Sequence, residues 1–412
     1  MAQHYQPKHF IRQAPNKLLQ HYLAGKGIGC NLPWKQIGEG HVEPIYHAFE
    51  AAPEMLRRQI DFDFCNIHGM ADEAGMRTMI SEARDHHHQG GLEIAEELGA
   101  MGSHIERAFW VFLEYPDVFQ VAMRFQKADT LGRYWRKRSD MPPVKAAIDR
   151  DAQERLGKAI TEYYTVKEGR GYACQVDHYD REGKLYWFCY PEDYAHGFLI
   201  YDEAHKLHPS IQRPAFEVIF VYSQAECSLD VYVEGDQKIV AEMQRIFGRT
   251  ILGLELPHME KPGIVYELNG LLDKNFPFST EPTDRVEEVR IKELKLRIMG
   301  QGNRRIALES DCSDGPKAVY SLLDDVLAGG TILRDLLALQ HVRIQLLFRA
   351  DERNRKRTLT FEVSHPNSCS LKYDPRHITA KELLKRWGVD VSGRAENSPP
   401  KHRRSIQSCL PA

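Results

Sequence analysis

The first candidate for a chemical centre in this 412-residue sequence is a pair of acidic residues beside a lysine. Glu293 and Lys295 lie in a charged stretch, VEEVRIKELKLRI, and Asp284 precedes it. Two carboxylates can hold a Mg²⁺ ion while a nearby lysine helps to activate water. Asp284, Glu293 and Lys295 are therefore candidate catalytic residues of a metal-dependent nuclease. Short patterns of this kind are common in charged strands, so we expect binding rather than catalysis.

Cations near the C-terminus form a second candidate site. From residue 283 onward there are 24 Lys and Arg against 17 Asp and Glu, a net charge of +7, while the rest of the chain carries −10. Cations on a sheet and its loops can follow the phosphates of a nucleic acid. The alternative is a solvated surface that neighbouring acids balance. The candidate nucleic-acid-binding residues are Arg290, Lys292, Arg304, Arg305, Arg353, Arg355, Lys356 and Arg357.

Cysteine spacing indicates neither a metal centre nor a disulfide framework. The eight cysteines are spread along the chain and none form C-x-x-C. We therefore expect no metal, no cofactor and reduced thiols in a cytoplasmic protein. No run of 18 uninterrupted apolar residues occurs, so we also expect no membrane association.

The elements that must position these residues begin with helices. Apolar residues recur every three or four positions between residues 92 and 113, which predicts a buried helix face. Pro142 and Pro143 then interrupt the chain. We predict a helical domain over residues 1–143 that contacts a protein partner. The recurring apolar residues are Ile94, Leu98, Met101, Ile105, Phe109 and Phe112.

The pattern changes to strands in the middle of the chain. Residues 172–178 and 185–190 flank a turn sequence, Asp-Arg-Glu-Gly, that predicts a hairpin with its glycine at positive φ. Residues 216–222 and 228–233 form a second candidate pair, and residues 237–247 a helix. We predict an α+β domain over residues 144–283.

The basic region, residues 284–391, is the predicted third domain. Strands are expected at 289–298, 304–308, 342–348 and 358–363, with helices at 316–327 and 380–387. The order β-β-α-β-β-α favours a sheet with helices on one face. Residues 392–412 are expected to form a disordered tail. The predicted fold class is α+β, with a helical N-terminal region followed by two antiparallel-sheet α+β regions.

Several long strings carry a resemblance to a known group of sequences. The chain resembles an uncharacterised family of bacterial proteins over most of its length, to about Val391. The resemblance implies a genomic-island or phage-defence association and carries no catalytic residue. The strings are QPKHFIRQAPNKLLQHY, ERAFWVFLEYPDVF, RYWRKR, YWFCYPEDYA, RPAFEVIFVYSQAECSLDVY and HPNSCSLKYD.

These observations favour a non-enzymatic binding or scaffold protein of the bacterial cytoplasm. Its basic C-terminal third is expected to contact DNA, RNA or another acidic partner, in a phage-defence setting. The alternative is a metal-dependent nuclease, or another nucleic-acid-processing enzyme, built on the acidic pair and its lysine. The two hypotheses differ in geometry, because the enzyme requires its three side chains to converge.

Overall fold

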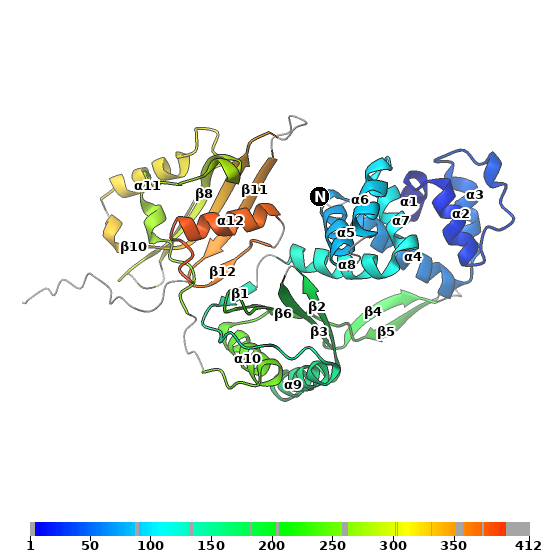
Figure 1. Ribbon diagram of the computed structural model, residues 1–412, viewed down its shortest axis with the longest axis horizontal. Helices are drawn as coiled ribbons and strands as arrows, with labels where there is room; N and C mark the ends of the chain where they lie inside the picture. Colours follow the sequence, from blue (N-terminus) through cyan, green and yellow to red (C-terminus); the bar gives the residue numbers. More distant parts are fainter. Residues whose placement is uncertain are drawn as a thin grey trace, which may run out of the picture. The chain divides into compact units, whose positions relative to one another are not determined.

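The computed structural model describes residues 5–86, 90–131, 135–181, 183–202, 206–257, 263–300, 302, 304–330, 332–350, 357–372 and 375–392 (Figure 1). The chain forms two compact units. Unit 1 comprises Met1–Leu131 and Ile148–Val221, and unit 2 comprises Gly132–Ala147 and Tyr222–Ala412. The α+β class with a helical N-terminal region is confirmed. The domain boundaries predicted at residues 143, 283 and 391 stay a prediction about which segments fold alone.

The N-terminal helices of unit 1 enclose a core rich in aromatic rings. Phe10 stacks on Phe64 with ring centroids 4.3 Å apart, and Tyr22 lies 5.2 Å from Phe64. The Tyr22 hydroxyl donates to Asp63 at 2.6 Å, which satisfies the polar end of a buried ring. The helices are α1 (Pro7–Gln13), α2 (Asn16–Gly25), η1 (Trp34–Gln36), α3 (Val42–Glu50), α4 (Glu54–Met70), α5 (Glu73–His86), α6 (Gly90–Ala100), α7 (His104–Glu114) and α8 (Pro116–Thr130).

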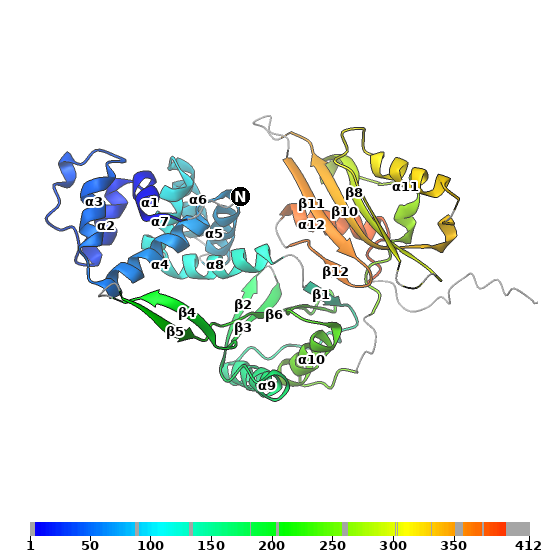
Figure 2. The same cartoon turned by 180° about the vertical axis from the view of Figure 1, so that it is seen from behind.

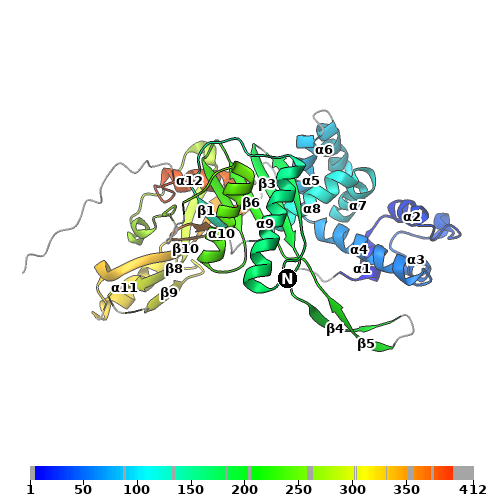
Figure 3. The same cartoon turned by 90° about the horizontal axis from the view of Figure 1, so that it is seen from below.

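The rest of unit 1 is a helix and strands. The predicted hairpin is confirmed: β2 (Cys174–Arg181) pairs antiparallel with β3 (Lys184–Pro191), and Gly183 in the turn has φ +72°. Helix α9 (Arg150–Glu168) packs closely on β2, where a Cβ at Gly157 would come within 2.8 Å of the Cys174 carbonyl oxygen. The hairpin of β4 (His196–Tyr201) and β5 (Leu207–Gln212) was not predicted, and Figure 3 shows it as a separate ribbon.

Two five-stranded sheets occur among the described residues. The first has the order β1-β7-β6-β3-β2, with β1 (Trp135–Arg138), β7 (Ser228–Tyr232) and β6 (Val218–Ser223). In unit 2, β1 pairs antiparallel with β7, and this stretch had been expected in the helical region. The Tyr222 hydroxyl donates to the carbonyl oxygens of Pro142 and Val144 at 2.9 and 2.8 Å, which fixes the segment with the two prolines. Helix α10 (Gln237–Phe247) and the π-helix η2 (Gly248–Leu252) follow.

The second sheet contains the candidate site and lies in unit 2. Its order is β12-β11-β10-β8-β9, and each strand pairs antiparallel with its neighbours in this order. The predicted β-β-α-β-β-α order is present, with the short β12 added. Its elements are η3 (Asn269–Leu272), η4 (Pro282–Asp284), β8 (Val286–Ile298), β9 (Arg305–Glu309), α11 (Ala318–Ala328), η5 (Arg334–Leu336), β10 (Leu337–Phe348), β11 (Arg357–Ser364), β12 (Ser368–Cys369) and α12 (Pro375–Arg386).

Helices cover one face of this second sheet. Leu294, Val342 and Phe361 from the strands form one core with Leu323 of α11 and Leu383 of α12. Figure 2 shows the strands from the side opposite α12. Because side chains alternate along a strand, the residues between these apolar ones point to the other face. The predicted tail at residues 392–412 lies, apart from Ser392, outside the described residues.

Candidate functional site

Strand register builds the candidate site on the polar face of the second sheet. Arg343 of β10 lies opposite Glu293 of β8 and opposite Glu362 of β11. One step along, His341 lies opposite Lys295 and Ser364. Register shifts beside Arg343 and His341 keep the polar side chains on one face despite an extra residue in each strand. Six polar side chains from three strands are thereby brought side by side.

Glu293 is the centre of this group. Its Oε1 lies 3.0 Å from Lys295 Nζ, and its Oε2 lies 2.7 Å from Arg343 Nη2 and 3.6 Å from His341 Nε2. The side chain is only 7% exposed. Burial raises the pKa of the Glu293 carboxyl, but the Lys295 hydrogen bond and the Arg343 charge outweigh it, so the pKa lies below its ordinary value. Glu293 is therefore ionised at neutral pH.

Arg343 links three carboxylates across the face. Besides Glu293, its guanidinium reaches Glu309 of β9 at 2.7 Å and Glu362 at 3.3 Å. A planar guanidinium with five N–H donors can serve several carboxylates at once, which a lysine cannot do with the same geometry. Arg343 therefore holds β8, β9, β10 and β11 together through charge-assisted hydrogen bonds and ion pairs.

His341 connects the acidic centre with a hydroxyl group. Its Nδ1 lies 2.8 Å from Ser364 Oγ, and its Nε2 faces Glu293. Burial lowers the pKa of His341 below its ordinary value, with help from the Lys295 charge and against the pull of Glu362 and Glu293. A neutral imidazole has one nitrogen with a free electron pair, which can bind a metal ion or accept a proton.

A cavity of about 340 Å³ opens over this group. Its size is at the lower end for small-ligand sites. Two of its serines are already oriented, because Arg136 of β1 donates to Ser368 Oγ at 3.1 Å and the Glu362 backbone N–H donates to Ser370 Oγ at 2.8 Å. Hydroxyl and cationic donors dominate the lining, which suits an anionic ligand. The lining residues are Lys295, His341, Arg343, Glu362, Ser364, Ser368 and Ser370.

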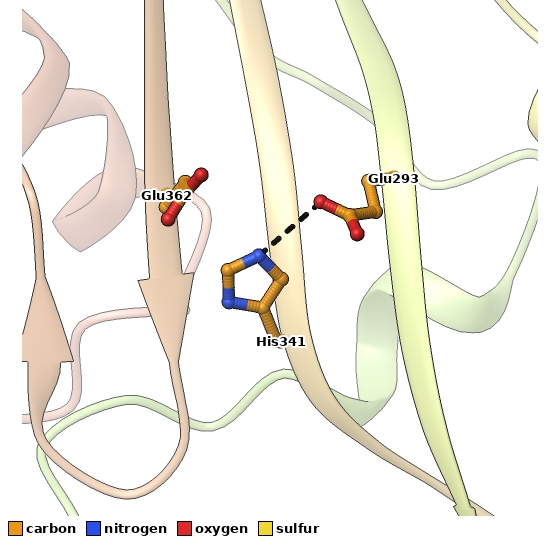
Figure 4. A group of neighbouring side chains, drawn as sticks. All are labelled: Glu293, His341 and Glu362. Atoms are coloured by element: carbon orange, nitrogen blue, oxygen red, sulfur yellow. Dashed lines mark ion pairs between the residues drawn. The ribbon is translucent and has the colours of Figure 1, made fainter. Parts of the chain in front are cut away.

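Three of these side chains also have the types and spacing of a metal site. Glu293, His341 and Glu362 each offer one ligand atom, and the three atoms lie within 4.8 Å of one another. Figure 4 shows them rising from three neighbouring strands, with the His341 ring between the two carboxylates. The sequence analysis missed His341 and Glu362. No local signal marks them, because they join Glu293 only through strand pairing.

The predicted catalytic residues are only partly brought together. Glu293 and Lys295 form an ion pair, as the nuclease hypothesis requires. Asp284 lies before the start of β8, where its carboxylate contacts Arg386 at 2.5 Å and accepts the Glu281 backbone N–H. Asp284 ends η4, and the strand from Val286 to Glu293 then spans about 20 Å, so Asp284 does not reach Glu293. Its hydrogen bonds serve to fix the start of the strand.

The predicted nucleic-acid-binding residues have different positions. Arg290 is on the polar face, opposite Gln345, and pairs with Glu288 at 2.6 Å. Arg305 of β9 is exposed opposite Arg297 on the same face. Lys292 lies at a register shift of β8, and Arg304 precedes β9. Arg357 lies opposite Phe348, in step with the helix-covered residues Leu359 and Phe361 of β11 and not on the polar face. Arg353, Arg355 and Lys356 lie outside the described residues.

Unit 1 contains a larger cavity, of about 450 Å³. Met70, Met123 and Phe188 supply its apolar lining. Of its charged residues, Lys127 pairs with Glu217, and Arg124 pairs at 3.1 Å with Asp177, which lies outside the lining. In the described part of the chain, the lining holds no cluster of three side chains that could bind a metal ion. The second sheet of unit 2 therefore carries the stronger candidate.

Comparisons of the chain with protein-family models, curated proteins and solved structures give no match. The bacterial family suggested by the sequence therefore stays a prediction. Among the described residues, no helix has the length and apolar character needed to cross a membrane.

Proposed function

We propose that this protein binds nucleic acid through the polar face of the second sheet in unit 2. The observation that carries the proposal is the cavity in which Lys295, Arg343 and His341 converge with three serine hydroxyls. Cations and hydroxyl donors on one surface are the groups that hold phosphate oxygens. A phosphate in this cavity would have donors from three neighbouring strands around it.

Charge on the face sets the expected strength of binding. The cations Arg290, Lys295, Arg297, Arg305 and Arg343 stand against Glu288, Glu293, Glu309 and Glu362, so the net charge is small. We therefore expect weak binding and a small slope of log K against log salt, because few counterions are released. Among the described residues of this face no tyrosine, phenylalanine or tryptophan is present for base stacking. We expect contacts to the sugar–phosphate backbone without sequence preference.

Fluorescence anisotropy tests the proposal with labelled single-stranded DNA, single-stranded RNA and duplex DNA at several salt concentrations in EDTA. We expect affinity to fall as salt rises. The double variant Lys295→Met/Arg305→Met should lower the slope of log K against log salt by about 0.7 for each lost contact to a single strand. Lys158→Met, an exposed cation on α9 of unit 1, is the matched control and should leave the slope unchanged.

Competition with unlabelled inorganic phosphate and with a mononucleotide distinguishes a nucleic-acid polymer from a small phosphate compound as the ligand. If either competes at concentrations close to those of the oligonucleotide, the ligand is a small phosphate compound rather than a polymer. No salt-dependent binding of any nucleic acid at low ionic strength would exclude the proposal. The expected bacterial cytoplasmic location, phage-defence role and protein partner of residues 1–143 stay predictions, which the identity of neighbouring genes would help to test.

A further inference from the structure

We propose that Glu293, His341 and Glu362 form a binding site for a divalent transition metal ion on the floor of the unit 2 cavity. No metal was expected from the cysteine spacing, and these three ligands are far apart along the chain. The metal site does not depend on the proposed function, but the inference that a phosphate ligand binds beside the metal rests on the proposed function. An imidazole with two carboxylates suits Zn²⁺ or Mn²⁺ better than Mg²⁺ or Ca²⁺, which prefer oxygen ligands alone.

Distances within the group fit a shared ion. Two ligands that each lie about 2.1 Å from a tetrahedral ion are about 3.4 Å apart. His341 Nε2 and Glu293 Oε2 are 3.6 Å apart, too far for a direct hydrogen bond. The third ligand atom, from Glu362, lies within 4.8 Å of the other two. A small rotation of the Glu362 side chain, which is 40% exposed, would complete a three-ligand site.

Buried atoms without hydrogen bonds give independent support. Glu293 Oε2 and His341 Nε2 are both inaccessible to solvent, and neither forms a hydrogen bond. Arg343 is within ion-pair distance of that Glu293 oxygen but does not hydrogen-bond to it. His341 Nε2 is therefore the atom without a partner, a state that is uncommon in native proteins and costs about 1–3 kcal/mol. A cation beside it would satisfy His341 Nε2 and share Glu293 Oε2 with Arg343.

Surrounding groups already orient the ligands as in known metal sites. Metal-bound histidines usually donate their second N–H to a nearby oxygen, which fixes the ring and the tautomer. Ser364 Oγ, 2.8 Å from His341 Nδ1, can accept that hydrogen bond and leave Nε2 free for the ion. Lys295 holds the other oxygen of Glu293 at 3.0 Å, and Arg343 contacts Glu362.

Charge balance predicts that metal and phosphate bind cooperatively. The three carboxylates of Glu293, Glu309 and Glu362 are matched by two cations, Lys295 and Arg343, so a bound divalent ion leaves the group with a net charge of +1. A phosphate in the cavity would neutralise this charge. Metal binding should therefore be moderate alone and tighter with a phosphate ligand, and phosphate affinity should rise by the same factor when metal is bound. Three protein ligands leave positions open on the ion for such a ligand.

The test uses the full chain without an affinity tag, stripped with EDTA and then freed of chelator. Titration calorimetry with Mn²⁺ and with Zn²⁺ should give one site per chain. Glu362→Gln and His341→Gln should each weaken it at least about tenfold. Glu309→Gln is the matched control, because Glu309 also pairs with Arg343 on this face but is not a proposed ligand. It should keep the affinity within about threefold. Added inorganic phosphate should strengthen binding in the wild type.

Each other outcome has a defined meaning. No saturable binding of either ion at millimolar concentration would overturn the metal site, as would equal weakening by Glu309→Gln and Glu362→Gln. Because nucleic-acid binding is measured in EDTA, its failure affects only the proposed function. Thermal unfolding of each variant excludes loss of fold as the cause. Glu362→Asp, which keeps the charge on a shorter arm, should recover part of the affinity if the carboxylate is a ligand.

Discussion

Arg343→Met is expected to destabilise the second sheet of unit 2 far more than Arg290→Met. Both arginines lie on the polar face of this sheet, in neighbouring strands. Arg343 contacts three carboxylates, whereas among the described residues Arg290 pairs with one, Glu288. Methionine keeps much of the apolar length of the side chain, so the comparison isolates the guanidinium.

The expected magnitude follows from burial. Removing one partner of a fully buried pair costs about 3–5 kcal/mol. Here Arg343 is 27% exposed, Glu309 is 63% exposed, and Lys295 still neutralises Glu293. We therefore expect a loss of about 2–3 kcal/mol in the free energy of unfolding, mostly from the buried Glu293 carboxylate. Arg290 and Glu288 are both about 30% exposed, and their pair is expected to contribute less than about 1 kcal/mol.

Native-state hydrogen exchange read by mass spectrometry measures this effect in the sheet itself. Protection of the backbone amides of β8, β10 and β11 gives the free energy of opening for that region, separately from unit 1. Arg343→Lys should recover only part of the loss, because an ammonium group cannot bridge three carboxylates. If Arg343→Met and Arg290→Met lower protection equally, the bridging of the three carboxylates contributes nothing and the reasoning is wrong.

Two further predictions concern local packing and pH. Gly157→Ala should destabilise unit 1 by about 1–2 kcal/mol, because a Cβ 2.8 Å from the Cys174 carbonyl oxygen costs more than the gain in helix propensity. Gly69→Ala, whose Cβ would have nothing within 4 Å, should stabilise unit 1 by up to about 1 kcal/mol. Urea unfolding measures both changes. Asp284→Asn should destabilise unit 2 at pH 7 and progressively less below about pH 4. Burial raises the pKa of Asp284, but hydrogen bonds from Arg386 and Glu281 lower it overall. A carboxyl whose pKa is lower in the folded state stabilises the protein above its unfolded-state pKa, and this contribution is lost as the pH falls through the folded-state pKa. A constant difference between pH 7 and pH 3 would contradict this assignment.

Local periodicity determined much of the secondary structure. Alternating apolar residues placed β8, β10 and β11, and three-to-four spacing placed α10 and α11, because side-chain direction repeats every 2 residues in a strand and every 3.6 in a helix. The turn at Gly183 followed from local backbone chemistry. Strand β1 was missed because its four residues, Trp135–Arg138, have no apolar alternation and are held in place by pairing with β7.

The composition of the candidate site was decided by tertiary structure. From the sequence, Asp284 was the proposed acidic partner of Glu293, yet the strand from Val286 to Glu293 is extended and separates the two by about 20 Å. Antiparallel pairing instead places His341 and Glu362, from strands later in the chain, beside Glu293. Which residues meet across a sheet depends on strand order, register and the shifts at its bulges, and these are set by how whole strands pack on the helix-covered core.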